Sequence, residues 1–179
     1  MQVTSARPNR KPSRLPNHDY SHAGPYFVTI CTHNNSCLLS TVQGEHVHLS
    51  LAGEVARETW HALPDRFPQV ALDEFVIMPN HVHGILALVG AGLAPPGAPN
   101  VKSTFSSHCS LPAVIGAFKS ISTIKINRLL KRSGQLFWQR SYYEHIIRNG
   151  EDMKNAQRYI LENPLKWSLD REYLESRKR

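Results

Sequence analysis

The chain has 179 residues, of which 41% are hydrophobic, and a formal net charge of +7. This length suffices for one domain with its own core, without disulfide or metal staples. The three cysteines have no C-x-x-C spacing, which favours neither a disulfide framework nor a cysteine zinc site. Residues 1–16 hold no apolar segment long enough for a signal peptide or a membrane span. We therefore expect a soluble cytoplasmic protein.

The first half of the chain predicts a basic arm followed by strands and one helix. Residues 1–20 are polar and basic and predict a flexible arm. Aromatic and β-branched residues predict a strand over 26–32, and a short second strand follows at 46–49. Ser50 is a candidate N-cap for a helix that runs to about Leu63, where Pro64 and Pro68 close the segment.

The middle of the chain predicts two strands, a long loop and a helix. Residues 70–78 and 81–89 are apolar strands separated by a Pro-Asn break. Residues 90–110 are rich in Gly, Pro, Ala and Ser and predict a mobile loop. A helix is expected from Leu111 to about Lys131. Its predicted inward side chains are Val114, Phe118, Ile121, Ile124 and Leu129.

The last part predicts a strand, a helix and a charged tail over 169–179. Residues 137–148 form the expected strand, and Asn149 caps a helix that Pro164 should stop at Asn163. The resulting order, β-β-α-β-β-α-β-α, lacks the pattern of a doubly wound parallel fold. It predicts an α+β fold in which helices pack on an antiparallel sheet, as in ferredoxin-like proteins.

Two histidines in the predicted strand 81–89 indicate a metal site. His81 and His83 are two residues apart, so a strand directs both imidazoles to the same face. A divalent cation is the simplest ligand for two imidazoles at one point. The alternative for this motif alone is a pair of polar histidines with ordinary hydrogen bonds.

The predicted C-terminal helix carries a second pair of chemically suitable residues. Tyr159 and Asn163 are four residues apart, so they lie one turn from each other on the same helix face. A tyrosine hydroxyl beside a metal is a credible nucleophile toward phosphate, and an asparagine oxygen is a suitable ligand for a hard cation. The adjacent Tyr142 and Tyr143 are interpreted as packing or base-stacking residues.

Basic residues are concentrated in the second half of the chain. Residues 101–148 contain eight Lys or Arg and a single acid, Glu144, which is typical of a nucleic-acid-binding surface. The alternative is a basic face that serves solubility. The first candidates for backbone phosphate contacts are Lys119, Lys125, Arg128 and Arg140. His145 and Arg148 are either further phosphate contacts or ordinary strand surface.

Four segments together resemble the REP-associated tyrosine transposases, which are single-tyrosine HUH nucleases. They are Val76-Ile-Met-Pro-Asn-His-Val-His83, Ala117-Phe-Lys-Ser120, Trp138-Gln-Arg-Ser-Tyr-Tyr-Glu-His-Ile-Ile-Arg148 and Tyr159-Ile-Leu-Glu-Asn-Pro-Leu-Lys166. The strand over 26–32 is similar too. The resemblance covers about residues 20–168, so a transposase catalytic domain is expected over 21–168.

The resemblance implies a role for each site residue. His81 and His83 would bind Mg²⁺ or Mn²⁺, Tyr159 would be the nucleophile, and Asn163 would complete the metal shell. The implied activity is cleavage and transfer of hairpin-bearing single-stranded DNA, such as repetitive palindromic elements, through a 5′-phosphotyrosine. A nucleoid-associated protein and a homodimer are compatible with it, and the sequence does not decide whether Tyr159 serves its own histidines.

Two other functions remain open from the sequence. One is a regulator that binds hairpin DNA or RNA on the same fold without cleaving it. The other is a metal-dependent hydrolase, which would release its product through water and form no covalent link. The presence of Tyr159 one turn from Asn163 disfavours the hydrolase.

Overall fold

The computed structural model describes residues 23–44, 46–89 and 109–167. The strands are β1 (Gly24–Cys31), β2 (Ser40–Gln43), β3 (His46–Leu49), β4 (Val70–Ile77), β5 (His81–Leu88) and β6 (Tyr143–Ile146). The helices are α1 (Leu51–His61), α2 (Leu63–Arg66), α3 (Leu111–Leu129), α4 (Gly150–Lys166) and the 3₁₀ turn η1 (His33–Asn35). The predicted arm (1–20), the predicted tail (169–179) and most of the predicted loop (90–110) lie outside the described residues.

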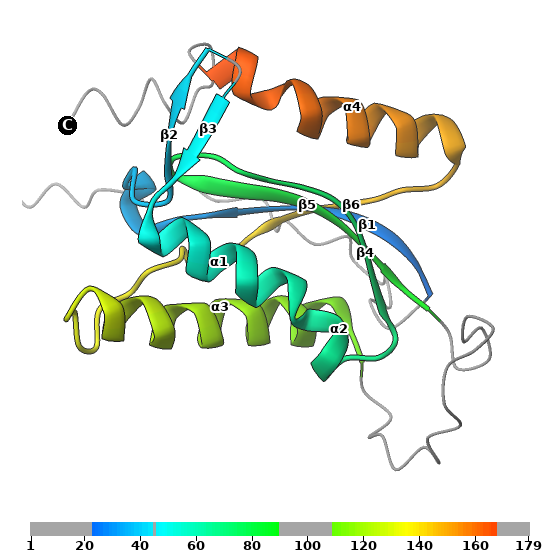
Figure 1. The fold of residues 1–179 in the computed structure, drawn as a ribbon. Coiled ribbons are helices and arrows are strands. Elements are labelled where there is room, and N and C mark those ends of the chain that lie inside the picture. The colour runs from blue at the N-terminus through cyan, green and yellow to red at the C-terminus, as the bar shows by residue number, and fades with distance from the viewer. Residues whose placement is uncertain (1–22, 45, 90–108, 168–179) are drawn as a thin grey trace, which may run out of the picture.

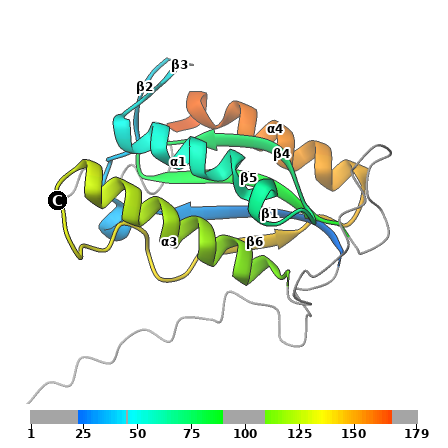
Figure 2. The ribbon, with the colours of Figure 1, turned by 60° about the horizontal axis from the view of Figure 1, so that its bottom comes forward.

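A four-stranded antiparallel sheet in the order β4-β5-β1-β6 forms the centre of the fold. The connections β1-α1-β4 and β5-α3-β6 each skip one strand, which is the split βαβ arrangement of ferredoxin-like proteins. Helices α1 and α3 cover one face of the sheet, and α4 covers the other (Figures 1 and 2). The predicted α+β fold with helices on an antiparallel sheet is confirmed.

The sheet divides the apolar side chains between its two faces by strand alternation. On β1, Val28 and Ile30 join the large core against α1 and α3, whereas Phe27 joins a smaller cluster against α4. In the large core, the Trp60 ring stacks on Phe75 at 4.7 Å between centroids. Gly84 makes this possible, because a Cβ there would lie 2.5 Å from Cζ2 of Trp60.

The hairpin β2-β3 forms a separate two-stranded sheet. The sequence predicted only its second strand. The first strand, Ser-Thr-Val-Gln, has a single apolar residue and therefore no recognisable alternation. Gly44 follows it with φ of 61°, a left-handed conformation that glycine adopts without steric cost.

The first helix begins as predicted, and the third differs in its buried face. The Ser50 hydroxyl caps α1 by accepting from the Gly53 amide at 3.1 Å. Pro64 does not end a helix but lies in the first turn of α2, where its missing N–H costs nothing. On α3 the prediction that Ile124 and Leu129 point inward was wrong, since they are 60% and 44% exposed. The buried residues of α3 are Leu111, Val114, Ile115, Phe118, Ser122 and Ile126.

Two predicted boundaries near the C-terminus were wrong. The last strand covers only Tyr143–Ile146, because its pairing with β1 ends at Tyr143 and the chain before it returns to the end of β1 only in an isolated bridge between Trp138 and Thr32. Helix α4 does not stop at Asn163 but includes Pro164 and ends at Lys166. Proline disfavours, without forbidding, a helical residue before it, and burial of Asn163 and Trp167 on both sides holds this last turn on the sheet. Among the described residues, no helix is long and apolar enough to cross a membrane.

Candidate active site

The two histidines of the His-x-His motif lie on the α4 face of β5, as the strand alternation predicted. His81 is fully buried and His83 is 4% exposed. Their rings are 4.5 Å apart between centroids, and their Nε2 atoms are 2.9 Å apart. Two nitrogens that share a cation at about 2.1 Å each lie about 3 Å apart when the angle between the bonds is near 90°. The spacing of the two Nε2 atoms therefore suits a pair of ligands to one ion.

The other nitrogen of each ring has a hydrogen-bond partner inside the protein. Nδ1 of His81 lies 2.7 Å from Oδ1 of Asn80, which immediately precedes it in the chain. Nδ1 of His83 lies 2.8 Å from the hydroxyl of Thr29. Thr29 is opposite His83 in the β1-β5 register. Each ring is thus held in place through its Nδ1 atom, and the two Nε2 atoms face each other.

Helix α4 and its C-cap residue, Trp167, lie over the histidines and present three residues spaced one turn apart. The Tyr159 ring packs edge-on against His83 at 5.1 Å and against Phe27 at 5.8 Å. The Trp167 ring lies 5.8 Å from His81. Asn163 is one turn from each, and it is 3% exposed. Tyr159 itself is 44% exposed, so the same face of α4 offers a buried amide and an accessible phenol beside the histidines.

Burial favours the neutral form of His83. The pKa of His83 is held well below its ordinary value, first by burial and second by the neighbouring His81. A neutral imidazole keeps a lone pair on one nitrogen, which is the form that binds metals. At neutral pH, His83 is therefore in the ligand form.

The donor set fits a divalent cation. Oδ1 of Asn163 is buried and has no hydrogen-bond partner within the described part of the chain. An unsatisfied buried acceptor is unusual in a folded protein and is explained if a cation occupies the space in front of it. Residues 23–44, 46–89 and 109–167 contain no cluster of three or more His, Cys, Asp or Glu that could hold a metal. A cation here would therefore depend on the amide as well as on the two imidazoles.

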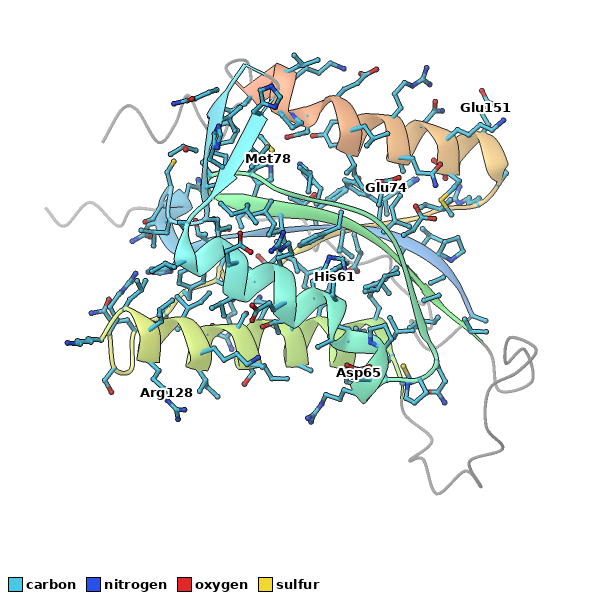
Figure 3. All side chains as sticks on the ribbon, viewed as in Figure 1. His61, Asp65, Glu74, Met78, Arg128 and Glu151 are labelled. Atoms are coloured by element: carbon cyan, nitrogen blue, oxygen red, sulfur yellow. The ribbon has the colours of Figure 1, made fainter. Side chains whose placement is uncertain are left out.

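The basic residues named from the sequence fall into two groups. Lys125, Arg128 and Arg140 are exposed, and Arg128 points from α3 away from the sheet (Figure 3). Lys119 is different, because its ammonium donates to the carbonyls of Gln139 at 2.6 Å and Arg140 at 2.9 Å. Partial burial lowers the pKa of Lys119, and Cys31 opposes that shift. Lys119 thus binds the segment after α3 to the helix.

His145 and Arg148 lie where β6 leads into α4. Nε2 of His145 is 3.0 Å from both carboxylate oxygens of Asp152, and the Arg148 amide donates to the same carboxylate at 3.1 Å. These bonds, His145 first, lower the pKa of Asp152. The Arg148 side chain is exposed. His145 therefore orders the start of α4, and the Arg148 side chain is directed to solvent.

A cleft of about 1390 Å³ lies along α3. One wall is α3, and the other is formed by residues of η1 and of the segment 136–142. Because α3 and α4 cover opposite faces of the sheet, the cleft is separate from the histidine pair (Figure 1). Arg140 and the half-buried Tyr142 line it. Tyr143, the other tyrosine considered above, is 55% exposed and lies edge-on to Phe27 at 6.5 Å.

Sequence reasoning missed two polar residues behind the histidines, Thr29 and Asn80. Asn80 contributed only to the predicted break between the strands over 70–78 and 81–89. An asparagine next to a candidate ligand is nevertheless a local signal for a supporting hydrogen bond. Thr29 carries no such signal, because its partner His83 is on a strand far along the chain. Only the register between β1 and β5 identifies that pair.

The fold of the chain has a counterpart among solved structures. A solved structure of a REP-associated tyrosine transposase bound to a REP hairpin has a similar fold, with a TM-score of 0.60 at 19% sequence identity. The match covers 88% of this chain and 76% of that chain. The chain thus has the fold of a REP-associated tyrosine transposase, as its sequence motifs implied.

A sequence relative gives the family membership. A protein of Haemophilus influenzae, described as uncharacterized, is 32% identical over 170 residues, which cover 93% of this chain and 94% of the relative. The chain belongs to the same family as this protein. No protein-family model matches the sequence.

Proposed function

We propose that this protein is a single-tyrosine DNA transposase, which cuts and transfers single-stranded DNA that carries hairpins. The observation that supports this most directly is the packing of an accessible tyrosine, Tyr159, on a buried pair of imidazoles with facing Nε2 atoms. The shared fold with a transposase bound to a REP hairpin supports hairpin DNA as the substrate. The exposed Lys125, Arg128 and Arg140 are the proposed phosphate contacts.

The proposed metal ligands are His81, His83 and Asn163. When bound, Mg²⁺ or Mn²⁺ supplies Lewis-acid polarisation of the scissile phosphate and fixes its orientation. Burial lowers the pKa of His83 and so favours its neutral form, and the described part of the chain places no hydrogen-bond donor on the Asn163 oxygen. The buried ring of Trp167 packs beside His81 on the side of the C-terminal end of α4.

Tyr159 carries the covalent step. Its phenolic oxygen attacks the phosphorus and releases its proton to solvent or a nearby base. A bond forms between that oxygen and the 5′-phosphate while the P–O3′ bond breaks, and the departing oxygen takes up a proton to become a free 3′-hydroxyl. Attack by a 3′-hydroxyl on the same phosphorus reverses the step and joins the strands. The phosphotyrosine conserves the bond energy, so no nucleotide cofactor is needed.

The contact between Tyr159 and His83 within one chain supports a site that a single copy completes. A homodimer is compatible with this proposal but is not required for the chemistry. The alternative, a hairpin-binding regulator, would use the same basic surface without forming an adduct.

A denaturing gel tests the proposed function. Labelled single-stranded hairpin DNA from the sequences that flank the gene is incubated with the protein and Mn²⁺ or EDTA. We expect a DNA–protein adduct that requires Mn²⁺ and is lost in Tyr159→Phe. Tyr143→Phe is the matched control, because Tyr143 is also exposed and also packs on Phe27. Cleavage without an adduct would indicate the hydrolase, and binding without cleavage would indicate the regulator.

A further inference from the structure

The two side chains that contact Nδ1 of the histidines differ chemically: Asn80 carries an amide and Thr29 a hydroxyl group. Asn80 is fully buried, and the partner of its side chain within the described residues is His81, whose Nδ1 lies 2.7 Å from Oδ1. Its Nδ2 group is buried and has no partner there. Leaving a buried amide half satisfied costs stability, so this arrangement is explained if the Oδ1 contact has a function of its own.

An amide oxygen can only accept hydrogen bonds. Nδ1 of His81 must therefore carry the proton and donate to Asn80. A neutral imidazole has one N–H, so in that form of the ring Nε2 of His81 is left with the lone pair. Asn80 thus keeps His81 in the one tautomer that can bind an ion through Nε2.

A hydroxyl group can donate or accept, and Thr29 can therefore serve both tautomers of His83. Without a cation, Nε2–H of His83 can donate across 2.9 Å to the lone pair on His81, and the Thr29 hydroxyl can donate to Nδ1. With a cation on both Nε2 atoms, Nδ1–H of His83 can donate to the same hydroxyl at 2.8 Å. In each state every ring nitrogen of the pair has a partner.

We infer that Asn80 and Thr29 are positioning residues with distinct roles in the histidine pair. Asn80 locks His81 with its proton on Nδ1, whereas Thr29 lets His83 exchange its proton between Nε2 and Nδ1 as a divalent cation enters. The buried pair therefore needs no net charge and no unpaired ring nitrogen in either state. The second half of this inference rests on the proposed metal site, and the first half does not.

Nitrogen-15 NMR of the histidine side chains tests the inference, because ring nitrogens with and without a proton have different shifts. In metal-free protein near neutral pH, we expect the proton on Nδ1 of His81 and on Nε2 of His83. Saturation with Zn²⁺, a diamagnetic probe that favours imidazole, should move the His83 proton to Nδ1 and leave that of His81 in place. A proton on Nε2 of His81 in the metal-free protein would overturn the lock by Asn80.

Variants separate positioning from simple packing. Thr29→Val keeps the shape of the side chain but removes the hydroxyl, so Mn²⁺ affinity, measured from the electron paramagnetic resonance signal of free Mn²⁺, should fall about 10- to 100-fold. Thr29→Ser should restore it to within a few fold. In Asn80→Leu the His81 proton should no longer be confined to Nδ1. In Asn80→Asp, whose carboxylate also accepts a hydrogen bond at that position, the proton should stay on Nδ1. Equal Mn²⁺ affinity in Thr29→Val and Thr29→Ser would overturn the role of Thr29.

The two proposals fail in different ways. If wild-type protein binds neither Mn²⁺ nor Zn²⁺, the proposed metal site and the exchange at His83 are both wrong. The tautomer of His81 in metal-free wild type, compared with that in metal-free Asn80→Leu, then still tests whether Asn80 holds the proton on Nδ1. If wild type binds Mn²⁺ but forms no DNA adduct, the proposed transposase chemistry fails while the positioning roles stand.

Discussion

The ring of Tyr159 lies edge-on to that of His83, with 5.1 Å between centroids, although the two residues belong to a helix and a strand far apart in the sequence. The contact joins an accessible phenol to a buried imidazole on one chain. Because both residues belong to the same copy, the proposed nucleophile lies beside a proposed metal ligand without any contribution from a second copy.

The first prediction concerns this arrangement within one chain. A mixture of His81→Ala and Tyr159→Phe should form no DNA adduct, because each copy lacks one half of its own site. The measurement is the denaturing gel described above, with each variant alone and both together. Recovery of adduct in the mixture would show that Tyr159 of one copy serves the histidines of another.

Asn163→Leu should separate metal binding from folding. The change removes a buried acceptor that has no hydrogen-bond partner in the described structure, so the free energy of unfolding without metal should change by less than about 1 kcal/mol or increase. Mn²⁺ affinity should fall by about 10-fold or more. Urea denaturation and Mn²⁺ titration check the two effects, and Asn163→Asp, which keeps an oxygen ligand, should retain binding. Unchanged Mn²⁺ affinity in Asn163→Leu would contradict the assignment.

Lys119 and Lys125 should respond differently to substitution by methionine. Lys119→Met removes two hydrogen bonds from an ammonium to carbonyls and should lower the free energy of unfolding by about 1–3 kcal/mol. Lys125→Met is on an exposed position and should change stability by less than about 0.5 kcal/mol. It should instead reduce the salt dependence of single-stranded DNA binding by about 0.7 in the log–log slope. Fluorescence anisotropy at several salt concentrations measures that slope, and the reverse pattern would exchange the two roles.

Gly84 and Gly116 provide a matched pair for packing. Gly84→Ala places a Cβ 2.5 Å from the fully buried Trp60 ring, so it should destabilise the fold by about 1–3 kcal/mol. Gly116 lies within α3, where an added methyl group would point into open space, and Gly116→Ala should stabilise by about 0.5–1 kcal/mol through helix propensity. Chemical denaturation gives both values. An unchanged free energy of unfolding in Gly84→Ala would mean that the Trp60 ring can move aside without loss of stability.

The metal-free protein should lose stability as the pH falls below about 6.5, the ordinary pKa of histidine. Because burial lowers the pKa of His83 in the folded state, the unfolded chain binds one more proton in this range. The contribution is therefore fully present above the unfolded pKa and decreases at lower pH, with a slope that approaches about 1.4 kcal/mol per pH unit. Urea denaturation from pH 7.5 to 5.0 measures it. In His83→Gln, the free energy of unfolding should depend less steeply on pH. An unchanged slope would show that groups other than His83 cause the pH dependence.

Sequence periodicity predicted the parts of the site that depend on a single element. The alternation of β5 places His81 and His83 on one face, and the turn of α4 places Tyr159 and Asn163 on another. The same reasoning found the caps Ser50 and Asn149, whose side chains bond to backbone only three residues away. Each of these features follows from local backbone geometry, which a short stretch of sequence determines.

The sequence by itself thus determined the type of fold, the common face of the two histidines and the pairing of tyrosine with asparagine on a helix. Only the tertiary structure decided that Thr29 supports His83, that Lys119 is bonded to carbonyls, and that α4 continues through Pro164. These depend on strand register and on packing between distant segments. Such contacts result from many weak interactions acting together, and no local pattern of residues encodes them.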